Sequence, residues 1–553
     1  MNIKYFLIGI LLFLYIPVVK CNVASDLILS SKSEIVPILY SDGHSETLQN
    51  AVKLWATFFS IRGSETLIQT NDLDKVSFSK KNSIIAFETE SACPLAQKIG
   101  LDISELQNSR DESHIIYVDT WKKNPLVLIV GKTDIGVELG AWRLLSKVGV
   151  WNNSVSISSG IEVNKPFFNV REMHINNRPD YLSWDYKRFS EYPRYLKACG
   201  FNSVQLMECL SYWGYGNKKW SREEVASIFR TVAASAHEEG MFVSQFVWGE
   251  ELLNDSSLIS VSARTYGKLV DHLVTHWGDP GPGGYGITQT TTMDMLKAYR
   301  QYNPNCRATV STWYNHSFWN EEQAKNEGAK QMLDETFSPK EIGIALHRWW
   351  DDQGTSEGKN PARGELVLKS GRRLGIWGWY LCDYEMTPGE HLKTRVLDKY
   401  FSSLPSDVSD KVDWLSVEKC FHGGESRINQ YVSGQKMWNP YRPLREIMMD
   451  YCRAVYGPLY AEIMCDAYEC AEAMQVQYVR GNIPKSDLFP SVEGNIDFSN
   501  RVQEVLLELK KIQIPEDWQP NIPDIGDPKK DIKTLIQRLS NPIGEIIIVP
   551  SPV

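Results

Sequence analysis

The stretch Phe168-Asn-Val-Arg-Glu-Met-His174 decides the fold, together with the two elements that follow it. It predicts a strand. Next come a predicted helix over Tyr186–Gly200 and a second strand over Asn202–Met207. Glycine at the end of a helix accepts the left-handed conformation that commonly stops it. A strand, a helix and a second strand of this kind form the repeating unit of a parallel α/β sheet.

The same alternation continues along the chain. The helix predicted over Arg222–Gly240 has Ser221 as its N-cap and Glu224 three residues later, which is the pattern of a capping box. Further strands are predicted at 241–247, 269–276, 307–313, 342–349, 374–380 and 412–417. Eight units of this size favour a closed (β/α)8 barrel, the TIM barrel, over residues 167–440. A doubly wound open sheet is the alternative.

Different patterns flank the barrel. A small α/β domain is predicted over residues 24–163, with strands at 34–40, 83–87, 114–118 and 126–130 and helices at 46–61 and 135–148. A linker is predicted over residues 164–166. Residues 441–553 carry helical spacing and predict a helical region. The expected fold is therefore α/β: a TIM barrel preceded by a small α/β domain and followed by helices.

The first residues predict export. Residues 1–21 resemble a signal peptide, with an apolar run over Tyr5–Val19 that is short for a bilayer span. Lys20 fits cleavage rules poorly, and Cys21 is positioned to become a lipidated N-terminal cysteine. Lipid attachment to a membrane through Cys21, simple secretion and an uncleaved anchor all stay open. We expect a periplasmic, cell-surface or secreted protein.

Composition narrows the possible partners. The net charge is -9 and no basic stripe stands out, which excludes nucleic acid as an expected partner. The 18 Trp, 25 Tyr and 19 Phe residues are abundant, and Trp beside carboxylates is typical of sugar stacking. A glycan is thus the expected partner, and no cofactor is expected.

Active sites of TIM barrels form where the strands end at their carboxyl side. Six of the eight predicted strand ends combine an aromatic residue with a carboxylate. Hydrolysis of a glycosidic bond needs two acidic functions around that bond and a dry site that raises the pKa of the acid. The sequence therefore predicts a glycoside hydrolase that cleaves O-glycosyl bonds of a poly- or oligosaccharide.

Asp279, in a Gly-Asp-Pro-Gly turn after the fourth strand, is the first candidate for catalysis. Glu208 or Glu250 is the candidate general acid, and Asp351 and Asp352 come next. Tyr212, Trp213 and Tyr215 would shield Glu208 and raise its pKa. The candidates for binding the substrate near the other strand ends are Trp213, Trp277, Trp313, Arg348, Trp349 and Trp379.

Two other classes of function compete. A glycan-binding protein on a TIM-barrel scaffold would keep the stacked Trp residues without a convergent pair of acids. A metal-dependent hydrolase would need clustered ligands, but the histidines near strand ends lack HxH or HExxH spacing, so no metal site is expected.

A family resemblance lies in three stretches, which are Gly131-Lys-Thr-Asp-Ile-Gly with Gly140-Ala-Trp-Arg-Leu-Leu, Pro166-Phe-Phe-Asn-Val-Arg-Glu172, and 195–204. They resemble the non-catalytic N-terminal domain and the start of the barrel in bacterial β-N-acetylhexosaminidases of glycoside hydrolase family 20. Similar domains precede the barrels of family 84 hexosaminidases and of α-glucuronidases. The resemblance covers about residues 30–210 and, more loosely, the fourth strand.

The resemblance implies roles for individual residues. Arg171 matches an arginine that binds hydroxyls of the terminal sugar in family 20. At the fourth strand that family has His-x-Gly-Gly-Asp-Glu, whereas this chain has His276-Trp-Gly-Asp-Pro-Gly281, so its Asp stands one place early and the Glu is absent. The α-glucuronidases carry their acids on separate strands, a layout that Asp279 with Asp351 or Asp352 would fit. Arg171 and Arg348 would then bind a uronate.

Overall fold

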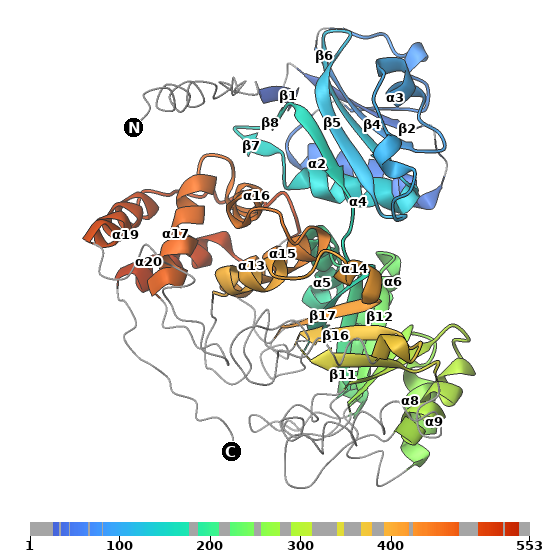
Figure 1. Ribbon diagram of the computed structural model, residues 1–553. Helices are drawn as coiled ribbons and strands as arrows, with labels where there is room; N and C mark the ends of the chain where they lie inside the picture. Colours follow the sequence, from blue (N-terminus) through green and yellow to red (C-terminus); the bar gives the residue numbers. More distant parts are fainter. Residues whose placement is uncertain are drawn as a thin grey trace, which may run out of the picture.

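The computed structural model describes residues 26–31, 35–41, 43, 45–64, 67–79, 81–175, 186–208, 222–247, 256–276, 289–311, 340–347, 367–378, 392–419, 424–474, 496–523 and 526–540. An N-terminal sheet domain, a closed barrel and a group of C-terminal helices follow one another along the chain (Figure 1). Among the described residues, no helix combines the length and apolar character needed to cross a bilayer.

A six-stranded sheet in the order β3-β2-β4-β6-β5-β9 forms the N-terminal domain. Its strands are β2 (Val36–Ser41), β3 (Ile68–Thr70), β4 (Asn82–Thr89), β5 (His114–Trp121), β6 (Asn124–Gly131) and β9 (Gly160–Asn164). Helices α2 (Glu46–Ile61) and α4 (Asp134–Leu145) pack on one face, and α3 (Pro94–Ile99) packs on the other. A three-stranded sheet adds β1 (Asp26–Ser30), β7 (Gly149–Trp151) and β8 (Ser154–Ser158).

Two glycines explain how closely helix α4 packs on the sheet. A Cβ at Gly136 would lie 2.5 Å from the carbonyl oxygen of Ser113, and one at Gly140 would lie 2.6 Å from Ile129 Cγ2. The start of α4 therefore approaches the sheet more closely than a side chain allows. The Gly-Lys-Thr-Asp-Ile-Gly stretch serves helix packing here.

All eight barrel strands are parallel, and β17 pairs with β10 to close the barrel. The strands are β10 (Val170–Ile175), β11 (Ser203–Glu208), β12 (Phe242–Val247), β13 (His272–His276), β14 (Arg307–Ser311), β15 (Gly343–His347), β16 (Leu374–Gly378) and β17 (Trp414–Lys419). The pairing of Val170 with Trp414 excludes the open doubly wound sheet, so the prediction of a TIM barrel is confirmed.

Helices surround the barrel and shield the outer side chains of its strands. The described ones are α5 (Tyr186–Cys199), α6 (Arg222–Glu238), α8 (Ser257–Tyr266), α9 (Gln289–Arg300), α13 (Thr394–Ser402), α14 (Val408–Lys411) and α15 (Gly424–Trp438). α5 ends at Gly200, whose φ of 106° suits glycine. Sequence patterns had not indicated α8, which is short and only moderately apolar.

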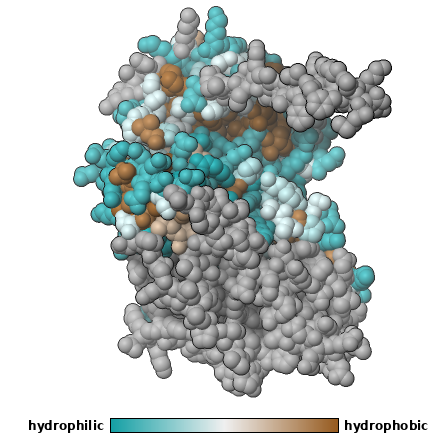
Figure 2. All heavy atoms as spheres, turned by 60° about the vertical axis from the view of Figure 1, so that its left-hand side comes forward, coloured by the Kyte–Doolittle hydropathy of each residue, from teal (hydrophilic) through white to brown (hydrophobic). Residues whose placement is uncertain are grey.

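The C-terminal part is helical, as expected. It contains α16 (Leu444–Tyr456), α17 (Ala461–Met474), α19 (Ile496–Leu509) and α20 (Pro528–Ser540), which pack on each other and on α15. On the face in Figure 2, hydrophobic residues gather in the upper part of the molecule, over the N-terminal domain. Ile28, Ile61, Ile135, Ile161 and Val163 of that domain are exposed.

Candidate active site at the carboxyl end of the barrel

The carboxyl ends of the eight parallel strands meet at one rim of the barrel, which we call the mouth. β11 ends at Glu208, β13 at His276 and β15 at His347. In β17, Glu418 stands in register with His174 of β10. The described backbone thus brings these strand ends to one rim, where barrels of this type place their active sites.

The remaining candidates follow these strand ends directly in the chain. Trp313 comes two residues after β14, Arg348 immediately follows β15, and Trp379 immediately follows β16. These residues, together with Trp213, Glu250, Trp277, Asp279, Trp349, Asp351 and Asp352, lie outside the described residues, and so does the side chain of Glu208. Their convergence in one pocket stays a prediction.

Beneath the mouth, three side chains form what we call the aromatic floor: His174, Phe246 and Trp377. Each is the residue before last of its strand, β10, β12 and β16. The rings of Phe246 and Trp377 stack at 4.9 Å, and the His174 ring meets them edge-on at 5.3 and 5.9 Å. All three side chains are fully buried. The mouth therefore stands on three closely packed, buried rings.

A carboxyl group lies one layer below this floor. Glu172 Oε2 accepts a hydrogen bond from Ser203 Oγ at 2.7 Å, and Oε1 accepts one from Gln205 Nε2 at 2.6 Å. The hydroxyl of Ser244 also donates to this group. Burial raises the pKa of Glu172 to about 7, although these hydrogen bonds act in the opposite direction. Glu172 thus ties β10, β11 and β12 together and titrates near neutral pH.

Gln205 connects Glu172 to the aromatic floor. Its amide nitrogen donates to Glu172, so its amide oxygen is left to accept a hydrogen bond from Nδ1 of His174. This arrangement assigns the proton of neutral His174 to Nδ1. Burial lowers the pKa of His174 to about 3.

A second buried histidine, His272 of β13, lies beside Ser244. Nε2 of His272 lies 2.7 Å from Thr309 Oγ1, and burial lowers the pKa of His272 to about 3. Both histidines are therefore neutral at physiological pH. Apart from Glu172, the groups beneath the mouth are therefore neutral and buried. A low dielectric of this kind favours the protonated form of a carboxyl group, as a general acid requires.

Arg171 lies at the other end of the barrel. It is the second residue of β10, its side chain is fully buried, and Nη1 donates to Glu112 of the N-terminal domain at 2.7 Å. Nε donates to the carbonyl oxygen of Gly200 at 2.8 Å, and the guanidinium lies over the ring of Trp438 at 4.5 Å. In this structure Arg171 joins two domains and is remote from the mouth, because its partners stand at the amino ends of the strands.

Sequence reasoning missed Glu172, Phe246 and Trp377 as residues of this site. A signal for Glu172 was present, because polar residues alternate along the first two strands at Glu172 and His174 and again at Ser203 and Gln205. Alternate residues of a barrel strand face its interior. No group of three or more His, Cys, Asp or Glu side chains within the described residues is arranged to hold a metal ion.

Known structures share this architecture. The fold is similar to that of CpGH84B, with a TM-score of 0.60 and 13% identity over 93% of this chain and 86% of that one. It is also similar to that of a GH138 enzyme targeting pectin rhamnogalacturonan II, with a TM-score of 0.53 and 11% identity over 91% and 68%. A third is BtGH115A, a GH115 4-O-methyl-α-glucuronidase with specificity for decorated arabinogalactans, with a TM-score of 0.53 and 11% identity over 93% and 73%.

No protein-family model and no curated protein sequence matches this chain. At 11–13% identity the three structural likenesses show a shared fold, namely the barrel with its preceding sheet domain and following helices. This fold agrees with the resemblance expected from the Gly131–Leu145 and Pro166–Glu172 stretches.

Proposed function

We propose that the protein is an exported glycoside hydrolase whose active site lies at the mouth of the barrel. The observation that carries this proposal is the rim itself. Eight strands end there, the segments that follow them contain several carboxylates and Trp residues, and the buried aromatic floor lies beneath. The similar folds of GH84, GH138 and GH115 proteins give further support.

In this proposal Asp279 is one member of the catalytic pair. Glu208 or Glu250 is the general acid, with Asp351 and Asp352 as the next candidates. The acid protonates the leaving oxygen, while the second carboxylate acts as base, nucleophile or stabiliser. The low-dielectric base of the mouth favours the protonated form of the acid at neutral pH.

We propose the substrate class from the sequence resemblance, which favours a hexosaminidase-like or an α-glucuronidase-like activity on a glycan. The similarity to the GH115 4-O-methyl-α-glucuronidase supports the second of these. A cation near the mouth would favour a uronate, and Arg348, which follows β15, is the candidate for that contact.

Product analysis tests the proposal. The full chain is incubated with aryl N-acetylhexosaminides, aryl glucuronides and a panel of glycans, and released sugar is measured. On an accepted substrate, Asp279→Asn should reduce turnover about 10²–10⁴-fold. Glu208→Gln, Glu250→Gln, Asp351→Asn and Asp352→Asn then identify the partner.

The matched control is Asp294→Asn, a carboxylate on the exposed side of α9 that should leave turnover unchanged. Glycan binding without release of sugar from any substrate would instead favour a glycan-binding protein. Full turnover in Asp279→Asn would remove this residue from the catalytic pair.

A further inference from the structure

We propose that a cavity between the N-terminal domain and the barrel is a second binding site, for a neutral polyhydroxylated ligand the size of one or two sugar units. The cavity has a volume of about 470 Å³, within the usual range for small-molecule sites. Gly200, at the end of α5, and Trp438, at the end of α15, contribute to its wall. It therefore lies toward the amino ends of the barrel strands, away from the mouth.

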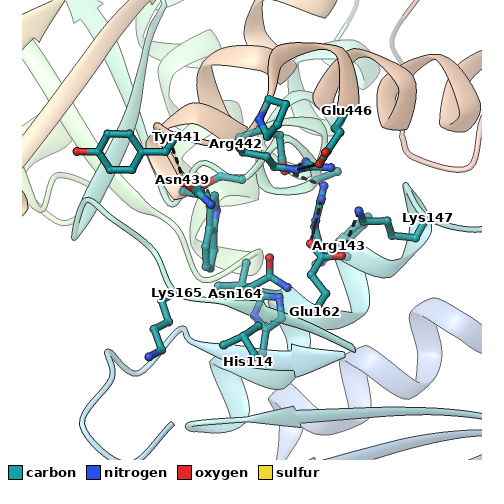
Figure 3. Close-up of a pocket in the computed structure, with 18 of the residues that line it drawn as sticks. His114, Arg143, Lys147, Glu162, Asn164, Lys165, Asn439, Tyr441, Arg442 and Glu446 are labelled. Carbon is teal, nitrogen blue, oxygen red and sulfur yellow. Dashed lines mark hydrogen bonds and ion pairs between the residues drawn. The ribbon is translucent and has the colours of Figure 1, made fainter. Parts of the chain in front are cut away.

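Several parts of the chain form the wall. His114, strand β9 and helix α4 contribute from the N-terminal domain, and the end of α5 contributes from the barrel. The segment from Gln435 to Glu446 contributes from the end of α15 and the start of α16. In Figure 3, His114 and Asn164 lie across the cavity from Arg442 and Glu446. A ligand here would contact three regions of the structure at once.

The charges of the wall are already compensated. Five basic side chains line the cavity, and each has a carboxylate within 4 Å: Arg143, Lys147, Lys165, Lys197 and Arg442. Arg143 also donates to Gln435 Oε1 at 2.7 Å and to Glu162 Oε1 at 3.1 Å. An anionic ligand would have to displace these carboxylates. The wall is thus better suited to an uncharged molecule.

Two buried polar atoms just behind the cavity surface have no hydrogen-bond partner among the described residues: Nε2 of His114 and Nδ2 of Asn164, whose residues pair across strands β5 and β9. Nδ1 of His114 lies 3.1 Å from the carbonyl oxygen of Glu112. A carbonyl only accepts, so Nδ1 carries the proton and Nε2 is an acceptor. Burial lowers the pKa of His114 to about 4, which keeps the ring neutral.

The wall thus contains one unsatisfied acceptor and one unsatisfied donor. Buried polar groups in folded proteins are nearly always paired, and leaving one unpaired destabilises the folded state. A hydroxyl group donates and accepts, so a polyhydroxylated ligand can supply both missing partners once a side-chain movement opens these atoms to the cavity.

Apolar and aromatic side chains complete the wall. Trp438 contributes an indole, and Ile161, Val163 and Tyr441 are exposed where they line the cavity. The C–H faces of a sugar ring pack on such surfaces while its hydroxyls bond to amides and charged networks. Water would satisfy the polar groups alone, but a sugar would also cover the apolar ones.

Isothermal titration of the full chain with glucose, N-acetylglucosamine and glucuronate tests this proposal. A neutral sugar should bind. Asn164→Leu, which deletes the amide at similar volume, and Val163→Trp, which fills the cavity, should each weaken that binding at least ten-fold. Ile135→Trp is the matched control, since Ile135 is an exposed residue of the same domain outside the cavity, and it should bind like the wild type. Thermal midpoints verify that the variants fold.

Three results would overturn the proposal: no binding of a neutral sugar, binding that neither cavity variant weakens, or binding of glucuronate alone that declines with added salt. The proposal does not depend on catalysis. Asp279→Asn should leave this binding unchanged, while the cavity variants should leave turnover at the mouth unchanged. A protein that binds sugar in the cavity but releases none from any substrate would refute the proposed hydrolase and keep this site.

Discussion

Arg171 of the first barrel strand donates to Glu112 of the N-terminal domain at 2.7 Å, and its guanidinium is completely buried. The same guanidinium lies over the ring of Trp438 and bonds to the carbonyl oxygens of Gly200 and Phe168. One side chain therefore connects the N-terminal sheet domain, the start of the barrel and the end of α15.

We expect Arg171→Met to destabilise the protein by about 3–5 kcal/mol, because it leaves the Glu112 carboxylate without its buried partner. The measurement is the free energy of unfolding in urea. Lys165→Met breaks the exposed pair with Glu105 across the same domain boundary and should cost at most about 1 kcal/mol. Equal losses in the two variants would contradict a bridging role for Arg171.

Replacing Glu172 by Gln should change how stability depends on pH. In the folded protein burial raises the pKa of Glu172 from 4.5 to about 7, so the folded state holds this proton more tightly than the unfolded one. The resulting stabilisation is complete below pH 4.5 and is lost as pH rises to about 7. Glutamine does not ionise, so the variant should gain stability relative to wild type across that window, by up to roughly 3 kcal/mol.

Denaturation midpoints between pH 4 and pH 8 provide this measurement. The quantity to compare is the difference in unfolding free energy between variant and wild type at each pH. Burial also raises the pKa of Glu472 to about 7, but Glu472 is present in both proteins, so its contribution cancels in this difference. Glu508→Gln, at an exposed ion pair with Lys511, is the control and should give a nearly constant difference. A constant difference for Glu172→Gln would show that Glu172 does not titrate in this range.

Trp377 and Trp379 should respond differently to replacement by Ala. Trp377 is fully buried in the aromatic floor, so its loss should cost about 3–5 kcal/mol of stability. Trp379 follows β16 and is expected to stack on the sugar, so its loss should raise KM with little effect on the thermal midpoint. A large loss of stability in Trp379→Ala would identify it as a core residue and remove it from the proposed substrate site.

We also propose that the protein is exported, by simple secretion, with an uncleaved anchor or with a lipid on Cys21. If Cys21 carries a lipid, Cys21→Ala should move the protein from the membrane fraction to the soluble fraction. Cys93→Ala, which replaces a buried thiol of the N-terminal domain, is the control and should not change the fractionation. Unchanged fractionation of Cys21→Ala would exclude the lipid anchor.

The sequence by itself determined the order of the barrel strands. The alternation of strands and glycine-ended helices after Phe168 predicted the barrel, because local periodicity and helix-stop signals lie within a few residues of each other. The strand ends, and hence the rim where the candidate carboxylates follow, could also be derived in this way. The sequence also shows that Glu172 and His174 face the same side of their strand, because successive side chains of a strand face opposite sides.

Only the tertiary structure decided which side chains meet. Arg171 and Glu112 are 59 positions apart, and Phe246 and Trp377 come from two separate strands, so no local pattern links them. The pKa of Glu172 depends on burial inside a closed barrel, and that burial exists only once β17 pairs with β10. The cavity beside His114 likewise arises only where two domains come together. Local chain propensities set the elements, whereas desolvation and contact between distant residues set the chemistry of each site.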